Sequence, residues 1–145
     1  MQVKVLSIVG FTSAVFALFG LILRDSLLGV GPISIGIQVA AFALMVWARI
    51  VFGVRSFHAA ANTTEGELVT SGPFAFVRNP IYTAVVLFTW TGVAVHFSAV
   101  NAALGLVVLA GMLVRIYFEE QMLRARYPAY ADYSRRVKRL VPFVF

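Results

Sequence analysis

Apolar residues occupy most of the chain in long runs, and short polar segments separate these runs. The first run extends from Val5 to Leu23 and holds nineteen uncharged residues. At about 1.5 Å per residue, a helix of that length crosses the roughly 30 Å hydrocarbon core of a bilayer. A second run covers residues 32–54, with Arg49 near one end. Gln38 lies within this run, and contact with a neighbouring helix explains it better than ligand binding.

A third apolar stretch is too long for one helix. Residues 80–114 include no Asp, Glu, Lys or Arg. As a single helix they would extend for about 52 Å, which exceeds the bilayer core. The polar residues at 96–101 therefore predict a tight turn between helices at about 81–97 and 100–120, with His96 as a solvated interfacial residue. Three glycines of these helices allow close helix contacts: Gly92, Gly105 and Gly111.

The composition agrees with this pattern and limits the class of protein. The 145 residues are 61% hydrophobic and 12% charged, with a mean hydropathy of +0.90. A soluble domain of this size cannot bury so much apolar surface. We expect one all-α integral membrane domain over residues 1–145. The absence of cysteine excludes thiolate metal sites and a cysteine nucleophile, and no metal site is predicted.

The charge distribution predicts the orientation of the helices. The net charge of +6 is best explained by cations in cytoplasmic loops and by their attraction to anionic lipid headgroups. Nucleic acid is not expected as a partner. With four spans, both termini and the 55–79 connection share the cytoplasmic side, whereas the opposite loops hold only one cation, Arg24. Pro128 predicts a short separate helix in the tail. The tail carries the cations Arg124, Arg126, Arg135, Arg136, Lys138 and Arg139 against the single acid Asp132. Three tyrosines spaced by three are most simply interfacial aromatics: Tyr127, Tyr130 and Tyr133.

Two adjacent acids lie at the end of the fourth apolar run. Glu119 and Glu120 are costly next to hydrocarbon unless they are paired, and acids at a helix C-terminus oppose the helix dipole. One interpretation is surface pairing at i,i+4 spacing, Glu119 with Arg115 and Glu120 with Arg124. The unfavourable placement favours a functional role instead.

The segment GPFAFVRNPIY, residues 72–82, interrupts the apolar pattern before the third helix. Taken alone, Arg78 is best explained as a positively charged anchor on the cytoplasmic side. Asn79 and Pro80 predict a helix N-cap followed by proline in the first turn. The start of that helix would also present N–H groups to an anionic ligand.

Together these blocks resemble the isoprenylcysteine carboxyl methyltransferase family and its relatives, the phospholipid methyltransferases. The family pattern is roughly G-P-[YF]-x-x-x-R-[HN]-P-x-Y, then an apolar hairpin, E-E-x-x-L, Y-x-x-Y and a basic stretch ending in proline. The first block is matched by Gly72, Pro73, Phe74, Arg78, Pro80 and Tyr82. The second is matched by Glu119, Glu120, Leu123, Tyr127, Tyr130, Tyr133 and Pro142. The resemblance covers residues 66–142.

The resemblance implies an S-adenosyl-L-methionine-dependent methyltransferase within the membrane. It places the cofactor on the cytoplasmic side, between the loop before the third helix, the adjacent helices and the C-terminal segment. A lipophilic acceptor, most simply the carboxylate of a prenylcysteine-like or other small lipid-like molecule, would enter from the bilayer among the membrane lipids. The cofactor-binding residues that it implies are Leu68, Val69, Gly72, Pro73, Phe74, Arg78, Asn79, Pro80, Tyr82 and Glu119.

The resemblance also implies roles near the acceptor. It assigns catalytic functions to Glu120 and to Arg126 six residues later, and a substrate contact to Tyr130. Our hypothesis is that Arg126 orients an acceptor carboxylate, whereas Glu120 orients the donor or a bound water. Glu120→Gln should then abolish turnover with little effect on the fold. In-line transfer from a sulfonium needs positioning and exclusion of water, and no metal.

Two departures from the family pattern affect the choice of acceptor. The family often has histidine where this chain has Asn79, and a neutral amide cannot act as a general base. A carboxylate acceptor needs no base, but an amine must lose a proton. The chain also has only about two helices before the signature, so the lipid tunnel is either more open or completed by a second copy.

Three other functions remain open at the level of sequence. A phospholipid amine N-methyltransferase uses the same cofactor. A membrane sterol-type reductase would use NADPH, and the basic tail could hold the extra phosphate. A non-catalytic membrane binding protein is the third, although the retained Glu119 and Glu120 argue against it.

Overall fold

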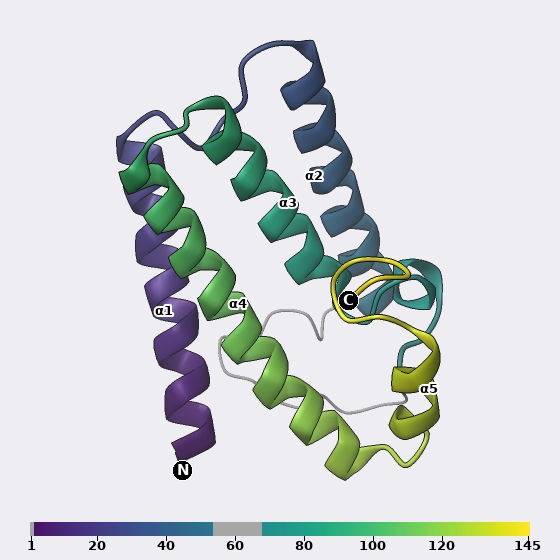
Figure 1. Cartoon of the computed structure of the whole chain (residues 1–145). Coiled ribbons are helices and arrows are strands. Elements are labelled where there is room, and N and C mark those ends of the chain that lie inside the picture. Colours follow the sequence, from purple (N-terminus) through teal and green to yellow (C-terminus); the bar gives the residue numbers. More distant parts are fainter. Residues whose placement is uncertain (1, 54–67) are drawn as a thin grey trace.

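The computed structural model describes residues 2–53 and 68–145, and these residues form an all-α protein (Figure 1). Four long helices are followed by a short one, as predicted. Within the described residues, the only β-type pairing is an isolated parallel bridge between Val77 and Lys138. The elements are α1 (Gln2–Leu23), α2 (Pro32–Phe52), the 3-10 helix η2 (Gly72–Ala75), α3 (Pro80–Val95), α4 (Ala99–Arg126) and α5 (Tyr130–Arg136).

The four predicted helices correspond to α1 to α4. α1, α2 and α4 are long and apolar enough to cross a membrane, whereas α3 is apolar but has 16 residues, fewer than the roughly 20 of a full span. α4 continues to Arg126, beyond the predicted end at 120. α2 ends at Phe52, where Gly53 has a φ of 71°, and Val54 lies outside the described residues.

Close approach of backbones holds α1 against α4. A Cβ atom added to Gly111 would lie 2.4 Å from the carbonyl oxygen of Gly10, so only glycine fits at this crossing. The neighbouring core consists of Ala14, Ala17 and Val108 with Met112. The predicted role of Gly111 in helix contact is therefore confirmed.

α3 lies between α2 and α4 and is held by glycine and polar contacts. A Cβ on Gly105 of α4 would lie within 3.4 Å of Val93 and Trp90 of α3. The Gln38 amide of α2 donates to the carbonyl oxygen of Phe88 in α3 at 3.0 Å, which confirms its packing role. At Gly92 the close neighbour is a loop, because an added Cβ would meet the Leu27 carbonyl between α1 and α2.

The predicted turn between α3 and α4 is also present. Ser98 caps α4 by accepting a hydrogen bond from the Asn101 backbone at 3.1 Å. Asn101 is buried, and its amide donates to the His96 carbonyl at 2.6 Å. The His96 ring nitrogen Nε2 lies 2.9 Å from the carbonyl oxygen of Leu28. His96 is therefore joined to the α1–α2 loop through a solvent-exposed contact.

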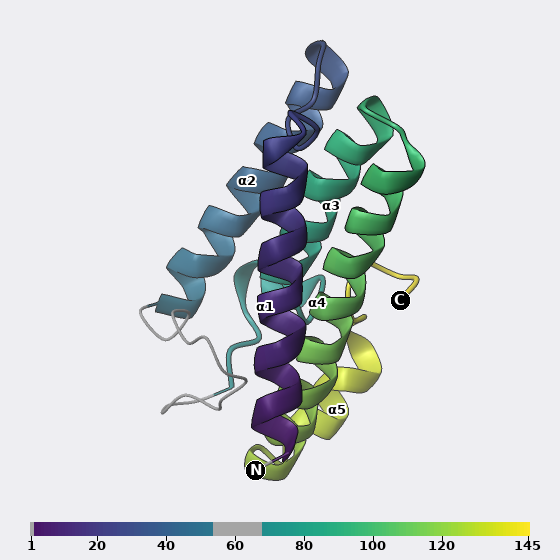
Figure 2. The ribbon, with the colours of Figure 1, turned by 90° about the vertical axis from the view of Figure 1, so that its left-hand side faces the viewer.

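The arrangement gives the bundle two different ends (Figure 2). The loop end carries residues 24–31 and 96–98. The opposite end carries the N-terminus, the start of α3, the end of α4, α5 and the tail (Figure 1). Large apolar side chains on the outer helices point away from the protein, for example Phe16 at 71% and Ile33 at 80% exposure. Such a surface suits lipid contact, and the chain is a multi-pass membrane protein.

Candidate functional site

The segment before α3 is anchored on α2. Gly72 has a φ of 59°, and a Cβ there would lie 2.9 Å from the Val51 side chain. Pro73 and Phe74 are buried, and the Phe74 ring stacks on Phe52 with centroids 5.7 Å apart. The glycine, the proline and the aromatic residue thus fix the path of the backbone toward Arg78.

Asn79 and Pro80 begin α3, but the asparagine side chain does not cap the helix. Asn79 occupies the N-cap position and Pro80 the first turn, as predicted. The Asn79 amide instead donates to Glu120 Oε1 at 3.1 Å and to the Arg139 carbonyl oxygen at 3.2 Å. The predicted N-cap is therefore correct in position, but no side-chain hydrogen bond joins Asn79 to the first turn of α3.

Glu120 is the centre of a buried charged cluster. Its Oε1 accepts from Arg78 Nε at 3.0 Å, and its Oε2 accepts from Arg78 Nη2 at 3.3 Å. Arg139 adds two further bonds to Oε2, from Nε at 3.2 Å and from Nη2 at 3.0 Å. With the Asn79 amide, the carboxylate accepts five hydrogen bonds and is 3% exposed. The surface pair with Arg124 is therefore wrong, and Arg124 lies 6.0 Å from the Tyr130 ring.

Arg78 joins this cluster to the C-terminal tail. Its Nη1 donates to the carbonyl oxygens of Ser134 at 2.7 Å and Val137 at 2.6 Å. Its backbone N–H donates to the Lys138 carbonyl at 2.8 Å. The Arg78 side chain is only 8% exposed. Arg78 therefore pairs with Glu120 and binds tail carbonyl oxygens, contacts that the interpretation as a positively charged anchor did not include.

Two tyrosines of the tail are part of this packing. Tyr130 is 1% exposed and Tyr133 is 5% exposed, so they are not interfacial side chains as the simplest interpretation held. The Tyr133 hydroxyl donates to the carbonyl oxygen of Phe74 at 2.6 Å. Burial raises the pKa of Tyr133 to about 12. The phenol therefore remains protonated, as its donor role requires.

A second polar group lies one residue away on α4. The Tyr82 hydroxyl donates to Glu119 Oε1 at 2.7 Å. Arg115 Nε donates to the Tyr82 hydroxyl at 2.6 Å and lies 3.1 Å from Glu119 Oε1. The predicted Glu119–Arg115 pair is confirmed. Phe11 of α1 lies beneath the guanidinium at 4.8 Å from its ring centroid. The two acids of α4 thus have separate partners.

The model of one protein family, described as phospholipid methyltransferase, matches residues 27–130. The chain belongs to this family. No curated protein and no solved structure matches the chain. The matched range runs from the α1–α2 loop to the first residue of α5, and it includes Arg78 and Glu120 but not Arg139. The predicted resemblance to integral membrane methyltransferases is confirmed, and membership identifies the chain as a membrane methyltransferase.

The residues predicted for the methyltransferase site do not all meet. Arg126 is exposed at the end of α4, its guanidinium lies 5.7 Å from the Tyr127 ring, and none of the hydrogen bonds to Glu120 comes from it. Leu68 and Val69 are half-buried and precede η2. The rest of the predicted 55–79 connection, residues 55–67, lies outside the described residues. Within residues 2–53 and 68–145, no group of three or more metal-ligating side chains occurs.

Arg139 is the residue of this methyltransferase that sequence analysis did not single out. It appeared only as one of six cations in the tail. Its contact with Glu120 depends on the chain reversing at Pro128 and returning after α5. No periodic spacing relates two residues on opposite sides of such a reversal. The one sequence signal for the tail around Arg139 was the basic stretch before Pro142 in the family pattern.

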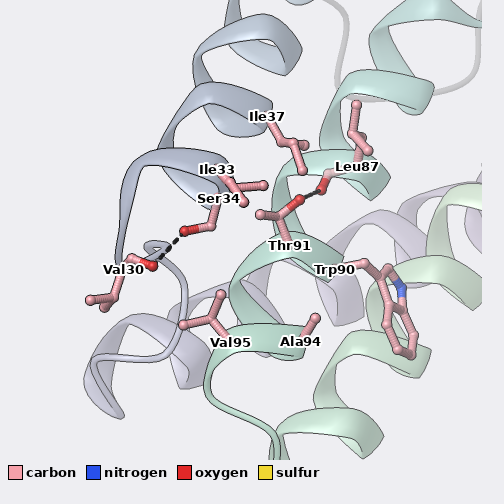
Figure 3. A pocket seen from close by; sticks show the side chains of 9 residues that line it. All are labelled: Val30, Ile33, Ser34, Ile37, Leu87, Trp90, Thr91, Ala94 and Val95. Carbon is pink, nitrogen blue, oxygen red and sulfur yellow. Dashed lines mark hydrogen bonds between the residues drawn. The ribbon is translucent and has the colours of Figure 1, made fainter.

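A groove between α2 and α3 lies toward the loop end, away from the charged cluster (Figure 3). Its walls are mainly apolar, and its two hydroxyls are engaged within their own chain segments. Ser34 donates to the Val30 carbonyl at 2.8 Å, and Thr91 donates to the Leu87 carbonyl at 2.7 Å. The groove therefore has no charged side chain among its lining residues. The indole Nε1 of Trp90 is its one buried polar atom without a hydrogen-bond partner within the described residues. The charged cluster is the better candidate for the site of methyl transfer.

Proposed function

We propose that this membrane methyltransferase transfers a methyl group from S-adenosyl-L-methionine to a lipophilic acceptor. The observation that carries the proposal is the buried cluster of Arg78, Glu120 and Arg139. This cluster joins the start of α3, the end of α4 and the tail at one end of an apolar bundle. Buried charges of this kind are rare at the ends of membrane helices unless they serve a function.

The residues around the cluster fit the chemistry of the cofactor. The cofactor carries a carboxylate, an ammonium and a ribose diol as well as an adenine ring. The cluster has two guanidiniums against one carboxylate, which suits an anionic group. The second Glu119 oxygen, Oε2, accepts no hydrogen bond within the described residues and suits a hydroxyl or an ammonium. Leu68 and Val69, which are half-buried, would supply apolar contact to the cofactor.

Several residues of the predicted cofactor set would act by shaping the site. Gly72, Pro73 and Phe74 fix the backbone against α2. Asn79 and Pro80 start α3, and Tyr82 holds Glu119. When bound, the cofactor supplies an electrophilic methyl group on a sulfonium.

Glu120 is better suited to positioning than to proton transfer. Five hydrogen bonds occupy its two oxygens, so no lone pair remains to accept a proton. We assign it the role of holding Arg78 and Arg139 at fixed positions. The contribution would be preorganisation of the charges that surround the reacting molecules. Arg126, which is exposed, remains our proposed contact for an acceptor carboxylate.

The acceptor that fits best is a carboxylate on a lipid-like molecule, because a carboxylate is already anionic and needs no base. Among the described residues, the single histidine, His96, lies at the opposite end of the bundle. Asn79 is neutral. The buried Tyr130 would support the acceptor site through its packing on Tyr133. A phospholipid amine is the second candidate, favoured by the description of the matching family.

We also propose that the charged cluster faces the cytoplasm. Arg24 and Asp25 are the only charged residues in the 24–31 and 96–98 loops, with opposite signs. The other end carries the basic tail. Cytoplasmic loops are enriched in Lys and Arg. The acceptor would reach the site laterally, through lipid around the exposed apolar faces of the helices.

The first experiment measures binding of S-adenosylhomocysteine and of NADPH to the purified protein in detergent by calorimetry. Binding of the first alone supports the proposal, whereas binding of NADPH alone would identify a reductase. Absence of binding to folded protein would favour a non-catalytic role.

The second experiment uses a radiolabelled methyl donor with a prenylcysteine analogue or with phosphatidylethanolamine. A carboxyl methyl ester releases volatile methanol in alkali, and an N-methyl group does not. Alkali-stable label on phosphatidylethanolamine alone would contradict the carboxylate assignment.

A further inference from the structure

Arg139 directs one edge of its guanidinium toward Glu120 and leaves another edge unused. Nε and Nη2 both donate to Glu120 Oε2. Nη1 has no hydrogen-bond partner within the part of the chain that the structure describes. The Arg139 side chain is 32% exposed, compared with 8% for Arg78. The end edge, formed by Nη1 and Nη2, therefore remains available to a ligand.

The orientation of this edge is fixed from two sides. The bonds to Glu120 fix the inner edge, and the Phe145 ring lies 5.4 Å from the guanidinium carbon. The Arg139 carbonyl accepts from the Asn79 amide, which holds the backbone of the residue to the start of α3. A guanidinium held in this way loses little conformational freedom when it binds a planar anion.

The charge balance of the cluster also calls for an anion. Arg78 is matched by Glu120, and four of its five N–H groups donate to protein acceptors. Glu119, the neighbouring acid, is paired with Arg115. One positive charge at Arg139 is left without a carboxylate of its own. A carboxylate is a planar anion whose two oxygens can accept from both nitrogens of such an edge.

We propose that the Nη1–Nη2 edge of Arg139 binds the carboxylate of the methionyl group of the methyl donor. This inference rests on the proposed function. The donor fits better than the acceptor because Arg139 follows α5, in the tail beyond the apolar helices, where a water-soluble ligand arrives. The match to the family model ends at residue 130, so the match does not include Arg139.

The test compares S-adenosylhomocysteine with its decarboxylated analogue, which keeps the adenosine and the amine. Affinities are measured by calorimetry, with no turnover needed. Removing the ligand carboxylate should weaken binding to the wild-type protein by about 10- to 100-fold, the effect of one charged hydrogen-bonded pair. In Arg139→Gln the two ligands should bind about equally, because the partner of the carboxylate is gone.

Two further variants distinguish a specific contact from general damage. Arg136→Gln removes an exposed arginine of α5 and should leave the full difference between the ligands. Arg139→Lys keeps the charge without the planar edge and should keep a reduced difference. If Arg139→Gln no longer binds the decarboxylated analogue, the difference between the two ligands in Arg139→Lys tests the assignment of Arg139 instead.

Each result has a distinct meaning. An equal carboxylate effect in the wild type and in Arg139→Gln would overturn the assignment of Arg139 and leave the methyltransferase proposal standing. Failure of the folded wild-type protein to bind S-adenosylhomocysteine would overturn both.

Discussion

Glu120 offers the sharpest test of the charged cluster, through its replacement by glutamine. The carboxylate is 3% exposed and pairs with two guanidiniums, Arg78 and Arg139. Glutamine keeps one acceptor oxygen but places an N–H₂ group against the arginine donors. It also leaves the Arg78 charge buried without a carboxylate partner, with only the Ser134 and Val137 carbonyl oxygens as strong acceptors. The geometry therefore revises the expectation that Glu120→Gln preserves the fold.

The expected loss follows from the burial of the pair. Breaking a buried ion pair on one side costs about 3–5 kcal/mol of unfolding free energy. The partly exposed Arg139 can recover some hydration, so we expect about 3 kcal/mol, the lower part of that range. A double-mutant cycle of Glu120→Gln with Arg139→Gln should show a coupling energy of about 1–3 kcal/mol, as for residues in one hydrogen-bonded network.

The assay is unfolding by sodium dodecyl sulfate in mixed micelles, followed by tryptophan fluorescence. Trp47 in α2 and Trp90 in α3 report on the packing of these helices. The matched control is Arg124→Gln, which removes the i,i+4 neighbour of Glu120. Because Arg124 is exposed and lies over the Tyr130 ring, its loss should cost less than about 1 kcal/mol. The buried cluster would be refuted if Glu120→Gln had the same free energy of unfolding as the wild type. It would also be refuted if Glu120→Gln and Arg124→Gln lost equal amounts of that free energy.

Two more predictions concern packing and burial. Gly111→Ala should lower the unfolding free energy by about 1–3 kcal/mol, because the new Cβ meets the Gly10 carbonyl. Gly36→Ala, which meets nothing within 4 Å, should be neutral or stabilising, and equal effects of the two would contradict the α1–α4 crossing. Tyr133→Phe should cost about 1–2 kcal/mol, because the buried Phe74 carbonyl loses its donor. Since the pKa of Tyr133 is raised from 10.0 to about 12, its contribution is complete below pH 10 and is lost as the pH rises toward 12. The stability of Tyr133→Phe should therefore fall less than that of the wild type over this interval in alkaline unfolding, and an equal fall would count against burial of the phenol.

The helices of this protein are readable from its sequence because their signals are local. An uncharged run of nineteen residues, Val5–Leu23, has one low-cost conformation in a bilayer. The existence of a turn follows from length, since no single span can hold residues 80–114, and the polar residues at 96–101 give its place. Pro128 separates α4 from α5 because proline cannot continue a helix. α4 nevertheless continues past the apolar run to Arg126. Periodicity and hydropathy detect only the apolar part of this helix, so the predicted end at 120 came too early.

The candidate site was harder to predict because its contacts are non-local. Arg78 and Glu120 are 42 residues apart, and Glu120 and Arg139 are 19 residues apart. From the sequence, the nearest partner of Glu120 was Arg124 on the same helix. Tyr133 looked interfacial because a chain pattern does not reveal that the tail folds back against Phe74. The family resemblance identified Arg78 and Glu120 without showing that they bind each other.

The two adjacent acids of α4 also restrict how the protein can move. Successive residues on a helix project about 100° apart, so Glu119 and Glu120 reach different neighbours from one turn. One acid is held by Tyr82 of α3 and by Arg115, and the other by Arg78 and Arg139. Rotation of α4 about its axis, or sliding along it, would break the contacts to Tyr82, Arg78 and Arg139 at once, whereas Arg115 lies on α4 and moves with it. Exchange of ligands at this end is therefore expected to proceed by displacement of the tail, while α4 keeps its angular setting.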